Sequence, residues 1–285
     1  MNGEALKQVI INADDFGLSR GVNRAIVECY KTGLLTSTSL MANMSAFEDA
    51  VHLCTSCPNL GIGVHLNLLR GAPVCDPRQV ASLVNQEGRF WGKPVVLYRR
   101  FLLKRISLDE VQRELDAQIA RVLDAGIRVT HLDSEKHTHL LLPGYAEQVC
   151  RAASRFDIQW VRRIRESVGL RGVVNRQVQK ALLLNIVASR SSGYWTDYGL
   201  QAVDHSAGVA NAPLDVAVYR AIFESLQSGV TEIVCHPGYV GESVDEVGQM
   251  YVDRYWEQER MALLDAELRE IVDCLEVHLT HFGRL

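Results

Sequence analysis

Short apolar runs alternate along this chain with longer stretches in which apolar residues recur at helical spacing. The apolar runs are typical of buried strands and lie near residues 9–11, 36–41, 61–68, 127–133, 158–161 and 232–235. The helical patterns lie at 20–32, 46–57, 94–125, 144–155, 172–188, 214–227 and 254–276. Within 94–125, a capping box at Ser107 and Glu110 predicts that a second helix begins there. Alternating strands and helices predict an α/β fold with a parallel sheet, and about seven such units favour a distorted, TIM-like (β/α) barrel.

Polar side chains follow the predicted strands at the points where these strands end. They are Asp14 and Asp15, His65 and Asn67, Asp133 through His139, Arg162 and Arg163, and His236. In a β/α barrel the carboxyl ends of the strands form the catalytic face. We therefore expect residues that are far apart in the sequence to converge there on one site.

The adjacent acids Asp14 and Asp15 directly follow the first apolar run. One of them could cap the helix that begins near Ser19 while the other lies in a solvated turn. Alternatively they form a catalytic pair, in which one carboxylate binds a metal ion and the other handles a proton.

The segment from His131 to His139 contains three histidines and two acids within nine residues. If the segment is extended, His131, Asp133 and Glu135 lie on one side of it, which suits convergence on a metal ion. A polar loop with one or two capping residues is the simpler interpretation. Which members of the segment would bind an ion stays open.

Further candidates stand singly at other strand ends. His65 lies within an apolar strand and could be a buried structural histidine, but its position at a strand end favours a ligand. His236 precedes Pro237-Gly238, a turn that would hold its imidazole at the barrel mouth. Arg162 and Arg163 could be solvated, or could orient an acid or bind a polar substrate.

Mixed aspartate and histidine ligands suit one divalent ion, with zinc or magnesium as the candidates and magnesium less favoured by imidazole. Such an ion polarises a carbonyl group and acidifies water. A second carboxylate would supply the base and a histidine on the far side the acid.

Composition narrows the class of protein. With 285 residues and 47% hydrophobic content, the chain is large enough to form one domain over 1–285. Its net charge of −4 and lack of long single-sign blocks argue against nucleic acid as a partner. Seven scattered cysteines, no apolar leader and no long apolar run predict a soluble, cytoplasmic protein.

Six motifs together resemble the YdjC-like carbohydrate deacetylases, also called the chitooligosaccharide deacetylase family. They are NADDFG at 12–17 with the following LSRGVNRAI, TSTSLMAN at 36–43, GVHLNL at 63–68, THLDSEKHTH at 130–139 and CHPGY at 235–239. The motifs occur in order over nearly the whole chain. The resemblance implies a distorted (β/α) barrel that removes N-acetyl groups from amino sugars with a divalent metal ion.

The resemblance also implies roles for individual residues. Asp14 would be the base, Asp15 and His65 metal ligands, and His236 the acid. The family's third ligand is usually a histidine at the position that Glu135 occupies here, so the chain departs from the family pattern. A carboxylate can replace an imidazole as ligand, and His137 is the rival. Substrate contacts would come from the polar residues Asn67, Asp133, Arg162 and Arg163.

The SEKH variant at 134–137 resembles the hopanoid-biosynthesis-associated branch of the family, which implies an N-acetylglucosaminyl glycolipid as substrate. The basic, apolar segment 97–106 and the apolar helix at 174–187 could then contact lipid or a membrane surface transiently, although ordinary packing is the simpler interpretation. Whether Lys136 contacts substrate and whether the chain forms a homodimer stay open. Another metal hydrolase acting on a phosphoester or cyclic amide, or a non-catalytic carbohydrate- or lipid-binding homologue, is the alternative.

Overall fold

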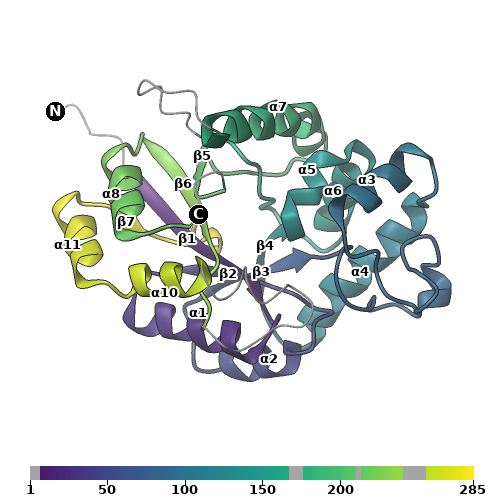
Figure 1. Cartoon of the computed structure of the whole chain (residues 1–285), viewed down its shortest axis with the longest axis horizontal. Helices are drawn as coiled ribbons and strands as arrows, with labels where there is room; N and C mark the ends of the chain where they lie inside the picture. Colours follow the sequence, from purple (N-terminus) through teal and green to yellow (C-terminus); the bar gives the residue numbers. More distant parts are fainter. Residues whose placement is uncertain (1–6, 167–175, 210–212, 240–254) are drawn as a thin grey trace.

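The parallel strands form one curled sheet that resembles half of a barrel (Figure 1). The computed structural model describes residues 7–166, 176–209, 213–239 and 255–285. The described strands are β1 (Lys7–Phe16), β2 (Ser37–Leu40), β3 (Gly61–Leu66), β4 (Val129–Ser134), β5 (His205–Ala207), β6 (Gly229–Cys235) and β7 (His278–Leu279). They follow the order β4-β3-β2-β1-β6-β5, and β7 pairs with β1. The predicted α/β barrel-like fold is confirmed.

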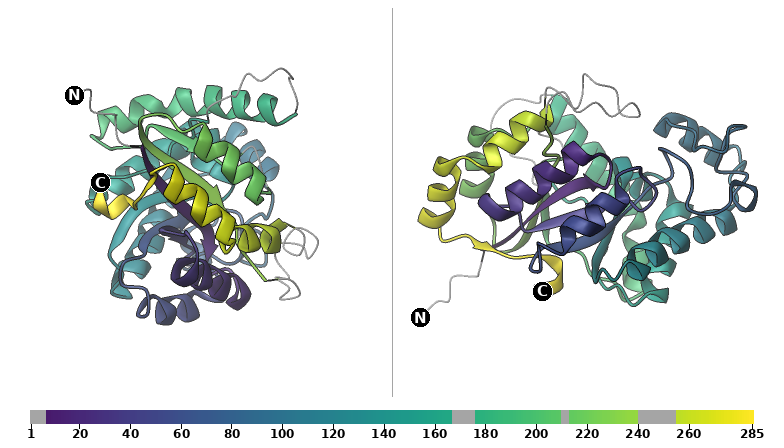
Figure 2. Two further views of the ribbon diagram at one scale, coloured as in Figure 1. Left: turned by 90° about the vertical axis from the view of Figure 1, so that its left-hand side faces the viewer. Right: turned by 90° about the horizontal axis from the view of Figure 1, so that it is seen from below.

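Helices surround the curled sheet (Figure 2). They are α1 (Arg20–Thr32), α2 (Phe47–Cys54), α3 (Pro94–Leu102), α4 (Leu108–Asp124), α5 (Thr138–Leu141), α6 (Pro143–Arg155), α7 (Arg176–Asp197), α8 (Val216–Glu224), α10 (Glu257–Leu263) and α11 (Ala266–Cys274). Ser19 and Ser107 cap α1 and α4 through their side chains, which confirms both expected helix starts. None of the described helices is both long and apolar enough to cross a membrane.

Three elements differ from the expectation. The stretch expected as one helix over 254–276 contains α10 and α11, because Asp265 adopts an extended backbone and caps α11 by accepting from the Glu267 amide. The segment 158–161 makes only isolated bridges, from Trp160 to Gln201 and from Val161 to Leu132, rather than a full strand. The expected helix over 172–188 begins outside the described residues, and α7 continues beyond its expected end to Asp197.

β1 is the central strand of the sheet and is buried along most of its length. Its residues from Val9 to Phe16 are all buried, since β2 and β6 flank it and helices cover it. A parallel strand in this position needs a continuous apolar run rather than alternation, which is what the Val9–Ile11 run provides. The two acids near its end are consequently held in a buried environment.

Candidate active site and metal centre

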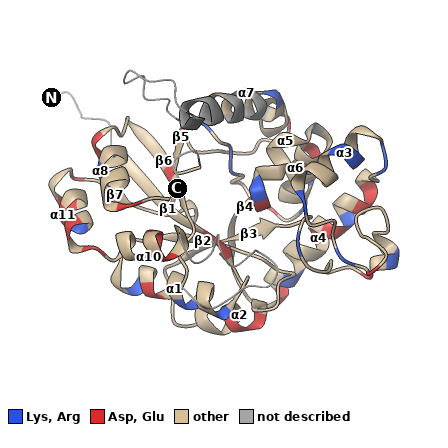
Figure 3. Ribbon diagram, in the orientation of Figure 1, with Lys and Arg blue, Asp and Glu red and all other residues tan. Residues whose placement is uncertain are grey.

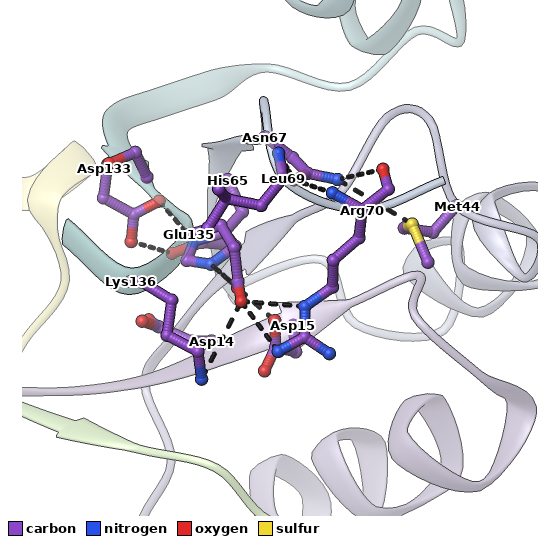
Figure 4. Close-up of polar contacts among 12 residues, drawn as sticks. Asp14, Asp15, Met44, His65, Asn67, Leu69, Arg70, Asp133, Glu135 and Lys136 are labelled. Carbon is purple, nitrogen blue, oxygen red and sulfur yellow. Dashed lines mark hydrogen bonds and ion pairs between the residues drawn. The ribbon is translucent and has the colours of Figure 1, made fainter. Parts of the chain in front are cut away.

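The ends of β1, β3 and β4 bring Asp14, Asp15, His65, Asp133 and Glu135 into one cluster (Figure 4). All five residues are at most 4% exposed. The convergence follows from topology, because these parallel strands end at the same edge of the sheet.

A bulge in β1 separates the two adjacent aspartates. Ala13 pairs with Thr38 and Phe16 with Leu40, so Asp14 and Asp15 together lie opposite a single residue of β2. Asp15 has a positive φ of 68°, a backbone conformation that is uncommon for a residue other than glycine. As a result the neighbouring carboxylates have different partners: Asp14 pairs with Arg162, and Asp15 lies beside His65.

Asp133 fixes the orientation of the His65 ring. The two residues are register partners on adjacent strands, and His65 Nδ1 lies 2.8 Å from Asp133 Oδ1. A carboxylate on Nδ1 directs Nε2 to the other side, where it lies 3.3 Å from Glu135 Oε2 and 3.7 Å from Asp15 Oδ1. This is the carboxylate–histidine arrangement that commonly supports a metal-binding imidazole.

Asp15, His65 and Glu135 fit a divalent ion. Their ligand atoms all lie within 4.8 Å of one another. A tetrahedral site with metal–ligand bonds of about 2.1 Å requires ligand atoms about 3.4 Å apart. The distances from His65 Nε2 to the carboxylate oxygens of Glu135 and Asp15 are close to this value. Asp15 Oδ1 is buried and accepts no hydrogen bond from the described residues. Burial and the charge of Glu135 raise the pKa of Asp15 to about 7. A bound cation would remove both unfavourable features.

Two members of the second possible ligand set of Asp14, His65 and Asp133 already pair with a cation, namely Asp14 and Asp133. The guanidinium of Arg162 donates from Nη1 and Nη2 to both oxygens of Asp14, at 2.8 and 2.7 Å, and pairs with Asp133 Oδ2 at 2.7 Å. It also contacts Glu232 on β6 at 2.8 Å. Arg162 is fully buried, so this cation is part of the protein interior.

Arg162 and burial act on the carboxylates in opposite directions. Burial raises the pKa of Asp14, but the Arg162 guanidinium more than compensates, and the net pKa is below the usual range. Burial raises the pKa of Glu232 to about 7 despite the same guanidinium. The cluster therefore keeps Asp14 ionised and disfavours a third charge at Glu232.

Arg70 holds the other oxygen of Glu135. Its Nε donates to Glu135 Oε1 at 2.9 Å and its Nη2 lies 2.8 Å from the same oxygen, while Lys136 Nζ lies 3.9 Å away. Glu135 Oε2 remains directed at His65. The two cations offset the negative charge that a carboxylate brings in place of an imidazole.

His137, the rival third ligand, is outside both ligand sets among the described residues. It has a left-handed φ of 52°, directly after Lys136 with a φ of 53°. Burial lowers the pKa of His137 to about 3, so its imidazole is neutral. The geometry favours Glu135 over His137.

His236 lies directly after β6, on the far side of β1 from His65. Its ring stacks on Trp256 with centroids 6.1 Å apart, and its backbone N–H donates to Glu259 Oε2 at 2.6 Å. Burial lowers the pKa of His236, and Glu259, Asp14, Lys136 and Glu135 also act on it. The His236 side chain is 30% exposed, its Nδ1 lies 3.9 Å from Glu259 Oε2, and the charges of the cluster act on it.

The residues that we expected to bind substrate are mostly buried. Asp133 and Arg162 are fully buried and contact protein groups, which favours an orienting role over direct substrate contact. Asn67 is buried and accepts from the amides of Leu69 and Arg70, so it shapes the loop that carries Arg70. Arg163 is partly exposed, and no described contact joins it to the cluster.

Three contributors were missing from the sequence-based expectation. Ser39 donates to Asp133 Oδ2 at 2.6 Å, and Arg70 and Glu232 make the contacts given above. Glu232 carried a usable signal, because an acid within a buried apolar strand needs a partner. Ser39 and Arg70 carried none, since their roles depend on contacts between distant segments.

Comparisons with known proteins agree on one family. The family model described as YdjC-like protein matches residues 8–273. A carbohydrate deacetylase from Thermoanaerobacter pseudethanolicus is 30% identical over 287 residues, with 98% of this chain and 100% of the relative covered. A chitooligosaccharide deacetylase from Klebsiella pneumoniae is 32% identical over 238 residues, which are 83% of each chain.

A solved structure supports the fold. It is that of an Enterococcus faecalis protein described as a candidate cellobiose-phosphate cleavage protein, with a TM-score of 0.76 and 23% identity. The match covers 98% of this chain and 99% of that protein. At this identity it shows a shared fold only.

Proposed function

The chain belongs to the YdjC-like family, and we propose that it is a metal-dependent deacetylase that removes the acetyl group from an N-acetylated amino sugar. The observation that carries the proposal is the buried set of Asp15, His65 and Glu135, with an Asp15 oxygen that lacks a hydrogen bond from the described residues. The deacetylase activity of the two relatives named above gives the reaction class.

In this proposal Asp15, His65 and Glu135 hold the ion, which when bound would polarise the acetamide carbonyl and acidify water. Asp133 keeps the His65 ring in the tautomer whose Nε2 faces the ion. Arg70 restrains Glu135 so that a single oxygen faces the site.

Proton transfer falls to Asp14 and His236. Asp14 lies near His65, which is one of the proposed ligands. Arg162 keeps the Asp14 carboxylate ionised, and a base that takes a proton from the attacking water must be ionised. His236, which is partly exposed and lies across the cluster from His65, would pass a proton to the departing amine; because its pKa is lowered, it would receive this proton during the reaction rather than hold it beforehand. The products are acetate and a free amino sugar.

The experiment that tests this function measures acetate released from N-acetylated chitooligosaccharides by protein loaded with zinc or magnesium. Asp15→Ala and His65→Ala should lose both metal and activity. The exposed Asp124→Ala variant provides a matched control that should retain both. Acetate release that is unaffected in the first two variants would contradict the proposed metal centre.

For the substrate we propose an N-acetylglucosaminyl group on a hopanoid glycolipid. The support is the Ser134-Glu135-Lys136-His137 segment, which resembles that branch of the family. A comparison of kcat/KM on chitobiose and on N-acetylglucosaminyl hopanoid tests it, because preference for the free oligosaccharide would contradict the lipid substrate.

A phosphoester hydrolase could use the arginines at 162 and 163 to bind the phosphate of its substrate. Arg162 is fully buried and is already paired with Asp14, Asp133 and Glu232, so it is unsuited to bind a phosphate from solvent. This favours amide hydrolysis. A panel of phosphoester and cyclic amide substrates provides the direct comparison.

A further inference from the structure

One surface segment differs in charge from the rest of the chain. Residues 88–108 contain six arginines and lysines and no acid, in a chain whose net charge is −4. Most of this segment forms α3 and the turn after it, which lie at one end of the molecule (Figures 1 and 3). The segment is thus a localised basic region, remote from the sheet centre.

The same segment exposes large apolar side chains. Val95 is 68% exposed, Tyr98 46%, Leu102 65% and Leu103 50%. Positions 95, 98 and 102 have the spacing of one helix face, while Leu97 on the opposite face is fully buried. Leu97 therefore attaches α3 to the protein body and leaves the apolar face toward solvent.

Further contacts fix α3 in this orientation. Arg100 lies over the Trp91 ring at 4.0 Å and donates to the Ser82 carbonyl at 3.3 Å, so this arginine faces the protein body. Exposed Lys93, Arg99, Lys104 and Arg105 then border the apolar face. We call these four residues together with Val95, Tyr98, Leu102 and Leu103 the α3 patch.

An apolar helix face bordered by basic residues is the chemistry that binds the surface of an anionic bilayer. The apolar side chains can enter the headgroup region while the cations pair with lipid phosphates. A symmetric contact between two molecules would instead bring like charges together, because a two-fold interface places the α3 patch of one molecule against the same patch of the other. Charge complementarity therefore favours lipid over a second copy of the chain.

We propose that the α3 patch is a peripheral contact site for anionic membrane surfaces. The contact is reversible, since it uses a short helix and a few basic residues rather than a membrane-spanning segment. It would hold the protein at a bilayer independently of the proposed metal centre.

The test is co-sedimentation of the full chain with phosphatidylcholine vesicles that contain or lack phosphatidylglycerol. The wild type should bind the anionic vesicles and release them at high salt. Neutralising two charges in Arg99→Gln/Arg105→Gln should weaken binding about 30-fold, at about 1 kcal/mol per basic residue. Val95→Ser/Leu102→Ser should weaken it comparably.

The matched control is Met261→Ser/Leu275→Ser, which removes two exposed apolar side chains, one on α10 (55% exposed) and one directly after α11 (37% exposed). This variant should bind vesicles like the wild type, and all variants should keep their circular dichroism spectra and their activity on a soluble substrate. Equal binding to neutral vesicles, or no binding to anionic ones, would overturn the proposal. The proposal would also be overturned if the wild type binds no vesicles but self-associates, and if Val95→Ser/Leu102→Ser abolishes this self-association.

Discussion

Replacing Asp133 by asparagine tests how the protein orients His65. Asp133 accepts from three donors: His65 Nδ1 at one oxygen, and Ser39 and Arg162 at the other. An asparagine has one acceptor oxygen and one NH₂ group, so in either orientation a donor faces a donor as long as His65 carries its proton on Nδ1. The variant therefore loses the His65 contact, loses the other two contacts, or shifts the His65 proton to Nε2, the nitrogen that would bind the ion.

The size of the effect follows from this loss. Removing such a supporting carboxylate typically lowers metal affinity about 10- to 100-fold, which corresponds to about 1.4–2.7 kcal/mol. Asp133 is also fully buried and paired with Arg162, so the free energy of unfolding should fall by about 3–5 kcal/mol. Metal affinity and stability should thus fall together.

The assay is competition between the protein and a chromophoric chelator for zinc, with urea unfolding of the same samples. Asp124→Asn, at an exposed position at the end of α4, is the control and should change neither quantity. If Asp133→Asn binds zinc with wild-type affinity while remaining folded, the assignment of Asp133 as the group that orients His65 is refuted.

Three further predictions concern the charges around Arg162. Asp14→Asn should abolish acetate release while metal content stays at the wild-type level, because Asp14 is the proposed base and not a ligand; full activity would contradict this role. Arg162→Met should lower the free energy of unfolding by about 3–5 kcal/mol or prevent folding, since it leaves buried carboxylates unpaired, and urea titration measures it. Burial raises the pKa of Glu232 from 4.5 to about 7, so the stability that this group contributes is present below pH 4.5 and lost as the pH rises through 7. Relative to Glu232→Gln, the wild type should lose up to about 3 kcal/mol over that interval, and parallel stability profiles of the two proteins would contradict the shift.

The sequence predicted the parts of the site that depend on local pattern. Asp14, Asp15 and His65 follow apolar runs, and parallel topology brings the ends of those runs together. The start of α4 was predicted from its capping box at Ser107 and Glu110, because capping depends on neighbouring residues. The start of α1 was predicted from apolar spacing, and its cap is Ser19 rather than Asp14 or Asp15.

Contacts between distant segments could not be predicted in this way. The pairing of His65 with Asp133 depends on the register between β3 and β4, and the contact of Arg70 with Glu135 depends on the path of an irregular loop. Arg162 looked like a surface or substrate-binding residue because a sequence does not reveal that three acids surround it. The Asp265 break between α10 and α11 was missed because apolar spacing continues across it.

An anomalous-scattering map of crystals grown with zinc tests the proposed metal centre most directly. The expected result is a single strong peak bonded to Asp15, His65 Nε2 and one oxygen of Glu135, with Arg70 on the other oxygen. A peak bonded to His137 in place of Glu135, or no peak at this cluster in zinc-soaked crystals, would contradict it.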